Sequence, residues 1–454
     1  MRREELTIDA VKQFAAEGHY DTARDGVAAL PPADAAHALT QLPVADAAEV
    51  FRLLTTETAT DLLAVMPDDF RQELLELLEP GEIAEVVEQM PPDEATDVLQ
   101  DMGQDEADEV LAAVEADTRA DLQALGSYTE DTAGGIMTNQ FAAVPIGVTA
   151  GEALAILRRD FADVEQLNVV YAVDAHRRLA GSFSLRDAVL ADPETTVRDL
   201  VERHRHWVQE HQDQEQVAHY MRLHDLDAVP VLDEHSRIVG QVTLDDAASV
   251  IDEEAAEDMA AMAGITGDEP VFGALGASLA RRLPWLLINA PLALAAANVI
   301  NMFERTIAAA AVLAVFLPVI GGMAGNAAGQ TLVVFIRALA VGEVTVRDAW
   351  RAAARQLLLA LLIGLILGGL LAGVTYAWKL SLPLAGIVGL ALLLNCLTGT
   401  LLGSLLPMLL RRLGIDPAMG SNTVTTSITD AFGYFYLLGL GAWALNHGLL
   451  KALT

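Results

Sequence analysis

Five long apolar segments fill the second half of the chain, and they constrain its fold more than any other feature. A helix needs roughly 20 apolar residues to cross the hydrocarbon core of a bilayer, and each segment reaches that length. The segments are about Leu283–Phe303, Ile307–Leu339, Gln356–Ala377, Leu384–Leu410 and Val424–Ala444. Five in succession favour a membrane domain over the core of a soluble helical bundle. The second contains Pro318 and a glycine cluster, which predicts a kinked or tilted helix.

The formal charge divides the chain at the same place. Residues 1–269 hold 17 Lys and Arg against 58 Asp and Glu, a charge of −41, whereas residues 270–454 hold 11 against 5 and carry +6. We therefore expect a soluble acidic half followed by a membrane half. Two explanations of the acidity stay open, a high-salt cytoplasm and a cation-binding surface. An acidic surface with few lysines argues against a nucleic-acid partner.

The distribution of Lys and Arg predicts the orientation of a multi-pass protein in the cell membrane. A cytoplasmic N-terminus puts eight basic residues inside: Arg281, Arg282, Arg337, Arg347, Arg351, Arg355, Arg411 and Arg412. It leaves three outside: Arg305, Lys379 and Lys451. This bias predicts a cytoplasmic N-terminus and an external C-terminus. The polar start of the chain predicts no signal peptide, and the lone Cys396 rules out an intrachain disulfide.

The acidic half contains two kinds of repeat. Residues 34–42 recur at 46–54, and residues 93–101 recur at 105–113, which predicts stacked short helices in a superhelical array. Residues 174–187 recur at 233–246 with a constant offset of 59, which indicates a duplicated unit. Each copy is expected to run strand, turn, strand and helix, with the first strands at Val169–Val173 and Ala228–Leu232. Ser184 and Thr243 are expected to be helix N-caps.

Asp430 is the charged residue of the fifth apolar segment. A carboxylate at membrane depth is costly to bury and marks an ion path by default, although a neighbouring helix could also satisfy it. Hydroxyl and amide residues precede it at an unusual density: Ser421, Asn422, Thr423, Thr425, Thr426, Ser427 and Thr429. Such a segment suits a water-filled lining better than a lipid-facing surface.

The second segment carries small and amide residues at helical spacing. Gly321, Gly325 and Gly329 fall on one helix face, which permits close contact with another helix. Asn326 and Gln330 are also four residues apart, beside the glycines. Their amides suit either interhelical hydrogen bonds or contact with a hydrated ion.

Two resemblances follow from these motifs. Gly181, Ser184 and Asp187 in the first repeat, with Gly240, Thr243 and Asp246 in the second, resemble a tandem cystathionine-beta-synthase (CBS) pair. The whole layout, with its glycine-Asn-Gln second segment and its Asp416-Pro-Ala to Thr-Asp430 fifth segment, resembles the MgtE-type magnesium channels. The implied fold is multidomain: an all-α acidic superhelical N domain (1–126), an α/β tandem CBS pair (127–246), a connecting helix (247–274) and a five-helix all-α transmembrane domain (275–454).

The resemblance implies a function and a set of residues. It implies a homodimer in the lipid bilayer that passes hydrated Mg²⁺ between two copies of Asp430. The implied pore lining is Asn326, Gln330, Thr426 and Ser427. Cytosolic Mg²⁺ is expected to bridge mutually repelling acids and shift the population toward a closed state. The implied sensor residues are Asp93, Asp97, Asp213, Glu215, Asp225, Asp246, Glu254, Glu257, Asp258 and Asp416. Those implied for ATP are Gly135, Ser184, Arg186 and Asp187.

Other functions were weighed against this one. A CBS-regulated transporter of Co²⁺ or Mn²⁺ stays open, whereas the lack of soft ligands in the spans disfavours copper and zinc. An anion transporter predicts a positive pore, but the in-span charge is negative. An enzyme is disfavoured because the sequence has no phosphate loop, no Gly-x-Ser-x-Gly and no His-Glu-x-x-His. Surface or capping roles are favoured over metal binding for His204, His206, His211, His219 and His224.

Overall fold

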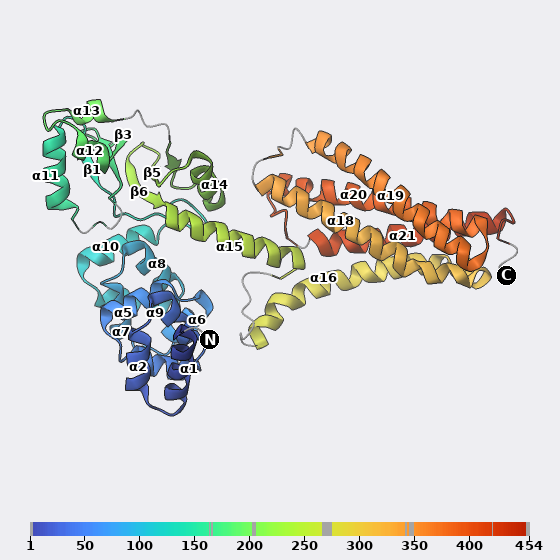
Figure 1. The fold of residues 1–454 in the computed structure, drawn as a ribbon, viewed down its shortest axis with the longest axis horizontal. Helices are drawn as coiled ribbons and strands as arrows, with labels where there is room; N and C mark the ends of the chain where they lie inside the picture. Colours follow the sequence, from blue (N-terminus) through green and yellow to red (C-terminus); the bar gives the residue numbers. More distant parts are fainter. Residues whose placement is uncertain are drawn as a thin grey trace. The chain divides into compact units, whose positions relative to one another are not determined.

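The structure, a computed structural model, describes residues 3–162, 164, 167–201, 206–265, 275–340, 343–344, 349–419 and 421–450. The chain forms two compact units, Met1–Asp252 and Glu253–Thr454 (Figure 1). Each unit is described by itself below.

Short helices build the first part of the first unit. They are α1 Arg3–Ala16, α2 Tyr20–Ala28, α3 Pro32–Thr40, α4 Val44–Phe51, α5 Thr56–Ala64, α6 Asp68–Leu75, α7 Pro80–Val87, α8 Pro92–Gln100, α9 Gln104–Ala113 and α10 Ala116–Leu125. Proline opens α3, α7 and α8, where its missing N–H leaves no helical bond unmade. Alternate helices pack in succession, α2 on α4 on α6 and α3 on α5 on α7 on α9. One continuous apolar core runs through them, which confirms the predicted stack.

Two three-stranded sheets follow, one for each predicted repeat. Their strands are β1 Ala143–Pro145, β2 Val169–Val173 and β3 Leu179–Ser184, then β4 Val208–Gln209, β5 Ala228–Leu232 and β6 Ile238–Thr243. In each sheet the first pair is parallel and the second antiparallel. The associated helices are α11 Ala150–Asp160, α12 Leu185–Leu190, α13 Val197–Leu200, α14 Gln214–His224 and α15 Leu244–Ala263. The strands predicted at 169–173 and 228–232 are confirmed at both bounds.

Close contacts join the two repeats. The Tyr171 hydroxyl is fully buried and donates to Gln241 Oε1 at 3.0 Å. Gly240 on β6 passes so near the preceding segment that a Cβ there would lie 2.6 Å from Met137 Sδ, so only glycine fits. Ser184 is a helix N-cap, as expected, because its Oγ accepts from the Asp187 N–H at 3.0 Å. Thr243 is the residue directly before α15, and its N–H and hydroxyl both donate to the Asp246 carboxylate; a cap by its hydroxyl oxygen stays a prediction.

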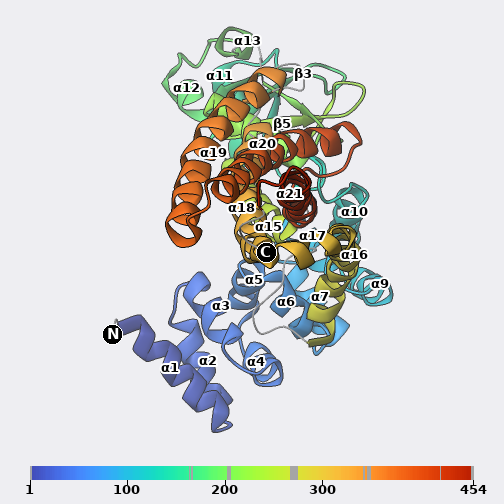
Figure 2. The same cartoon turned by 90° about the vertical axis from the view of Figure 1, so that its right-hand side faces the viewer.

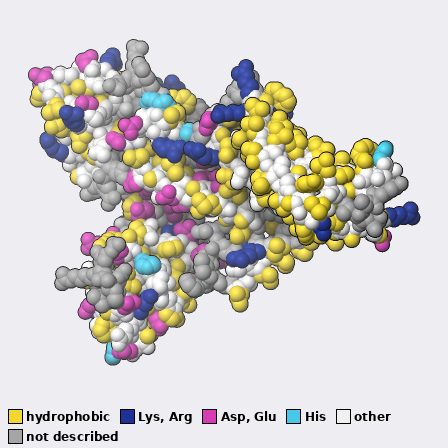
Figure 3. Space-filling view, turned by 45° about the vertical axis from the view of Figure 1, so that its right-hand side comes forward, with side chains coloured by type: hydrophobic (Ala, Val, Ile, Leu, Met, Phe, Trp, Pro, Cys, Tyr) yellow, Lys and Arg dark blue, Asp and Glu magenta, His cyan; other side chains and the backbone are white. Residues whose placement is uncertain are grey.

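Five helices of the second unit are long and apolar enough to cross a membrane, as predicted. These candidate spans are Ser278–Met302, Ala311–Leu339, Trp350–Lys379, Leu382–Arg412 and Asn422–Asn446. The elements of this part of the chain are α16 Leu275–Met302, α17 Glu304–Ala309, a 3-10 helix Ala311–Phe316, α18 Leu317–Ala340, α19 Ala349–Lys379, α20 Leu382–Arg412 and α21 Ser421–Asn446; α17 lies between the first two spans. Figure 3 shows apolar side chains covering these helices, as a lipid-facing surface requires.

Two elements differ from the sequence expectation. The second span was expected to be one kinked helix from Ile307, but the chain leaves helical geometry at Ala310 (φ −145°, ψ 72°) and passes through a 3-10 turn. Pro318 then lies in the first turn of α18, where a proline does no harm. The connecting helix was expected at 247–274; α15 begins at Leu244 and ends before Gly264, whose φ of +79° suits glycine. Residues 266–274 lie outside the described residues.

Helix α20 is the centre of the membrane bundle. It packs against α18, α19 and α21, while α16 packs against α21 (Figures 1 and 2). Glycines allow the closest approaches: a Cβ on Gly368 of α19 would lie 2.6 Å from the Gly389 carbonyl oxygen of α20. This packing fixes α18 and α21 side by side, and those two helices carry the polar residues that the sequence singled out.

Candidate functional site

The glycine face of α18 receives the polar face of α21. A Cβ on Gly321 would collide with Oδ1 of Asp430. One and two turns away, a Cβ on Gly325 would lie 3.4 Å from Thr426 Cγ2, and a Cβ on Gly329 would lie 3.1 Å from Asn422 Oδ1. The predicted close-contact face is therefore present. Because the glycines have no side chains, the carboxylate occupies the volume that a larger residue at 321 would fill.

An open cleft lies between α21 and α16. Its volume is about 480 Å³. It is lined by Asn289, Ala293, Ala296, Ala297, Ile300, Asn422, Thr423, Thr426, Ser427, Asp430 and Tyr434. The Ser427 hydroxyl donates to Asn289 Oδ1 at 2.9 Å and so ties the two helices together. Thus Thr426, Ser427 and the half-buried Asp430 share one polar cleft; Asn289 of α16 was missed by the sequence analysis.

The amides of α18 lie elsewhere. Asn326 and Gln330 are both exposed on the surface of this single chain, and neither lines the cleft beside Asp430. Gly322 precedes them on the same face and is also exposed, with open space where a Cβ would be. The assignment of these two amides to a pore lining therefore stays a prediction that needs a second copy of the chain.

A second acidic group lies where α15 meets the membrane bundle. Ala261 and Met262 pack against Leu332 and Ile336 of α18 and against Ala418 in the loop before α21. Burial, together with the neighbouring carboxylates of Asp416 and Glu257, raises the pKa of Asp258 to about 6. Asp416 accepts a hydrogen bond from the Ala418 N–H at 2.9 Å. The structure thus brings together Glu257, Asp258 and Asp416, as the prediction required; Glu254 is half-buried on the same helix.

A third acidic group lies in the first unit, between α8 and the second repeat. A small cavity of about 70 Å³ is lined by Asp93, Glu94, Asp245 and Asp246, together with Thr138 and Gln241. The Asp93 Oδ1 is buried without a hydrogen-bond partner, and burial raises the pKa of Asp93. Burial also raises the pKa of Asp246 to about 6, although its bond from Thr243 acts in the opposite direction.

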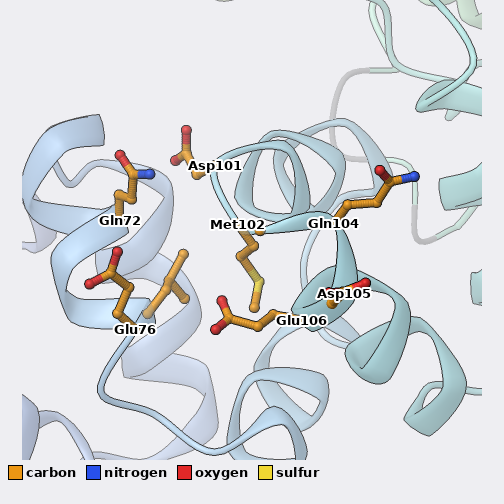
Figure 4. Close-up of a pocket in the computed structure, with 9 residues that line it drawn as sticks. Gln72, Glu76, Asp101, Met102, Gln104, Asp105 and Glu106 are labelled. Atoms are coloured by element: carbon orange, nitrogen blue, oxygen red, sulfur yellow. The ribbon is translucent and has the colours of Figure 1, made fainter.

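Asp97, one turn after Asp93, has a different neighbourhood. Burial raises the pKa of Asp97 to about 7, against the opposing effect of the Arg71 guanidinium. Arg71 is almost fully buried and pairs with Asp101 at 2.6 Å and with Asp68 at 2.7 Å. Asp101 also lines an acidic pocket of about 650 Å³, where Glu76 and Glu106 reach in from α6 and α9 (Figure 4). No local pattern predicts the Arg71 pairing, because its partner Asp101 lies 30 residues away.

The remaining predicted residues are placed in capping positions or on surfaces. Asp213 caps α14 by accepting from the Gln216 N–H at 3.1 Å, Glu215 follows in the first turn, and Asp225 ends the helix in left-handed geometry (φ 54°). The ATP candidates Ser184 and Asp187 bond to each other at 2.6 Å, beside the exposed Arg186. A Cβ on the fourth candidate, Gly135, would collide with the Glu130 carbonyl.

The histidines and acids of the described residues form no complete metal site. The rings of His206 and His224 lie with centroids 4.7 Å apart and are tilted by 46°. His206 Nδ1 lies 2.8 Å from the Tyr220 hydroxyl. His204 lies outside the described residues. Within the part of the chain that the structure describes, no three His, Cys, Asp or Glu side chains are arranged to hold a metal ion. The acidic groups above can therefore contact a cation through its waters, or can supply only part of an inner shell.

Comparisons with known proteins match these three regions. Residues 317–440 match the family described as "Divalent cation transporter" (MgtE), residues 30–131 the MgtE intracellular N domain, and residues 197–253 the CBS domain. The "Magnesium transporter MgtE" of Thermus thermophilus is 35% identical over 331 residues, 72% of this chain and 73% of that protein. The chain belongs to the MgtE family. The "Magnesium transporter MgtE" of Enterococcus faecalis is 34% identical over 315 residues, which are 69% of this chain and 69% of that protein.

A solved structure gives a further likeness for about half of this MgtE protein. It is described as the cytosolic domain of the Mg²⁺ channel MgtE in complex with ATP, and it is 32% identical with a TM-score of 0.50. The match covers 54% of this chain and 99% of that one. Membership of the family makes the protein an ion transporter of the membrane and not an enzyme. The CBS match covers only the second repeat, whereas the sequence offset and the first sheet establish the other.

Proposed function

We propose that this protein is a Mg²⁺ channel whose homodimeric pore passes the hydrated ion between two copies of Asp430. One observation carries the proposal: the Asp430 carboxylate is seated against Gly321 at the edge of a cleft lined by hydroxyls and amides. Burying a carboxylate in a span is costly, and such residues are rare and usually mark an ion path. The magnesium named for the relatives supports this choice of cargo.

The ligand set fits the chemistry of Mg²⁺. This ion sheds water reluctantly, so it usually keeps several waters and takes only one or two carboxylates. Asp430 with Thr426 and Ser427 offers oxygen atoms alone, and a symmetric partner doubles them. Selectivity then comes from the width of the path and the spacing of its acceptors. Co²⁺ and Mn²⁺ are the alternative cargoes, since both accept oxygen ligands.

The pore assignment is tested by a metal-by-metal flux assay. Purified protein is reconstituted in vesicles, and uptake of Mg²⁺, Mn²⁺ and Co²⁺ is recorded for the wild type and for Asp430→Ala. The variant should lose Mg²⁺ uptake while its elution on size exclusion stays unchanged. Retention of full flux by a correctly assembled variant would remove Asp430 from the path. Preferential uptake of Mn²⁺ or Co²⁺ by the wild type would favour the alternative cargo.

We also propose that cytosolic Mg²⁺ closes the channel by neutralising the two acidic groups outside the spans. The cavity around Asp93 and Asp246 and the group of Glu257, Asp258 and Asp416 both hold carboxylates whose pKa values are raised by burial or by each other. A bound cation relieves that repulsion and therefore favours whichever conformation keeps the acids together. This places the N-terminus and both acidic groups on the cytoplasmic side.

The sensor is tested separately from the pore. Asp258→Asn with Asp416→Asn, and Asp93→Asn with Asp246→Asn, should each raise the internal Mg²⁺ concentration needed to inhibit flux. Asp117→Asn is the matched control, because Asp117 is an exposed acid on α10 outside both groups. Unchanged inhibition in both double variants would refute the sensor and leave the pore assignment standing.

We further propose that the CBS pair binds ATP, because a relative's cytosolic domain was solved in complex with ATP. Gly135, Ser184, Arg186 and Asp187 are the residues to test. Titration of ATP into the full protein, followed by calorimetry, should give heat that Asp187→Asn abolishes. The absence of heat with the wild type would reject this site.

A further inference from the structure

Asn395 is a fully buried amide at the centre of the membrane bundle. Its Nδ2 donates to the Ile320 carbonyl oxygen of α18 at 3.1 Å. Its Oδ1 is buried and accepts no hydrogen bond from any residue that the structure describes. An amide that is only half satisfied costs folding free energy in an apolar interior, and an apolar residue of similar size avoids that cost. Stability alone therefore does not account for asparagine at this position.

The position of Asn395 relates it to Asp430 from two sides. Ile320, which it holds, is next to Gly321, the residue whose missing side chain makes room for the Asp430 carboxylate. On α21, a Cβ on Gly433 would collide with Asn395 Nδ2, and Gly433 is three residues after Asp430. One amide on α20 thus contacts both helices at the depth of the carboxylate.

The neighbouring residues of α20 show why this contact sets the geometry. Gly399, one turn on, approaches both helices: a Cβ there would lie 2.8 Å from the Ala324 carbonyl oxygen of α18 and 3.2 Å from Thr429 Cγ2 of α21. Glycine gives closeness but no directional bond. α18 also begins only at Leu317, after the 3-10 turn, so no continuous helix upstream fixes its first residues.

We propose that Asn395 is a positioning residue for the pore: its bond to Ile320 sets the register of α18 against α21, so that Asp430 reaches the ion path at the spacing that selects hydrated Mg²⁺. The inference rests on the proposed role of Asp430. It assigns selectivity partly to a side chain that does not touch the ion. Displacements of about 1 Å at a reacting group are known to cost on the order of 100-fold in enzymes, so a lost register bond is expected to be measurable in flux.

The test compares Asn395→Leu with three other variants. Uptake of Mg²⁺ and Mn²⁺ is measured in vesicles, and thermal unfolding is measured for each variant. Asn395→Leu keeps the size and removes the bond. It should unfold at the wild-type temperature or above, take up Mg²⁺ about tenfold more slowly and lower the Mg²⁺-to-Mn²⁺ ratio about threefold, by analogy with positioning groups. Thr398→Val is the matched control, because the Thr398 hydroxyl bonds to Tyr436 on α21 at 2.9 Å from the same helix. It should leave the ratio unchanged.

A second variant separates the bond from packing. Asn395→Ala combined with Gly433→Ala refills the space with the new Cβ and restores no bond, so its ratio should stay low. Recovery of the wild-type ratio, or a wild-type ratio in Asn395→Leu, would overturn the inference. Asp430→Ala is measured in the same assay. If it retains full uptake, the pore proposal fails. If it loses uptake while Asn395→Leu keeps the wild-type Mg²⁺-to-Mn²⁺ ratio, only the positioning role is refuted.

Discussion

Replacement of Gly321 by alanine tests most directly whether the contact with this glycine positions the Asp430 carboxylate. A Cβ at this position would collide with the carboxylate oxygen, and it would also lie 3.4 Å from Tyr434 Cε1. Overpacking of this kind costs about 1–3 kcal/mol, and the gain in helix propensity from glycine to alanine returns roughly 0.5–1 kcal/mol. The net destabilisation should be about 0–2.5 kcal/mol, and the carboxylate, as the end of a side chain, should be the group that moves.

Gly369 of α19 supplies the matched control. It is exposed in a membrane helix that does not carry the site, with nothing within 4 Å of the position of a Cβ. Gly369→Ala should therefore be neutral or stabilising by up to about 1 kcal/mol through helix propensity alone. Its Mg²⁺ uptake in vesicles should equal that of the wild type, whereas Gly321→Ala should lose most of its uptake because the carboxylate is displaced.

A double-mutant cycle decides whether the collision with Asp430 is the cause. Unfolding in denaturant is measured for Gly321→Ala in the wild-type background and in the Asp430→Ala background. Because the second background lacks the colliding oxygen, the cost of Gly321→Ala should shrink there by roughly 1 kcal/mol or more, as expected for residues in contact. An equal cost in both backgrounds, or equal uptake by the two glycine variants, would refute this account of the site.

Three further outcomes follow from the acidic unit and the mouth of the bundle. In Mg²⁺-free buffer, stability should fall as pH rises from about 4 to 7, because the pKa of Asp97 in the folded state, about 7, lies above its unfolded value and the folded state holds the extra proton; Asp97→Asn should flatten the slope seen by circular dichroism. Arg71→Ala leaves the carboxylates of Asp101 and Asp68 without their partner and should cost about 3–5 kcal/mol in chemical unfolding; little change would mean that those acids are already solvated. Inhibition by internal Mg²⁺ should weaken as pH falls below about 6, where Asp258 takes up a proton; a pH-independent inhibition curve would exclude that group from the sensor.

Local sequence signals predicted much of the fold. The offset of 59 residues placed β2 and β5 at their observed bounds, because duplicated sequence carries the same alternation of apolar residues and the same turn residues. The apolar segments identified all five spans, since length and composition decide membrane insertion. The break at Ala310 was missed, because no proline or glycine marks it and the apolar sequence continues through it.

The candidate site was predictable in its individual residues but not in its contacts. Asp430 was identifiable because a carboxylate is rare in a span, and the glycine face of α18 because of its spacing. Nothing local indicates that Asn289 bonds to Ser427, since the two are 138 residues apart and asparagine is common at polar positions. The same holds for Asn395 and Ile320, which are 75 residues apart. These pairs depend on which helices become neighbours, and the hydropathy of the sequence does not predict that.

Three groups of carboxylates share one physical property that connects transport with control. They are Asp430, the cavity around Asp93 and Asp246, and the group of Glu257, Asp258 and Asp416. In each, carboxylates lie close together or partly buried, and burial raises the pKa values of Asp246 and Asp258 to about 6. A protein with a formal charge of −35 keeps such groups only at a cost in folding free energy. Under the proposed mechanism a divalent cation offsets that cost where it binds, so we expect its concentration to set both the occupancy of the path and the compactness of the acidic unit. Transport and feedback by the same ion then need no separate ligand chemistry, only acids at different depths.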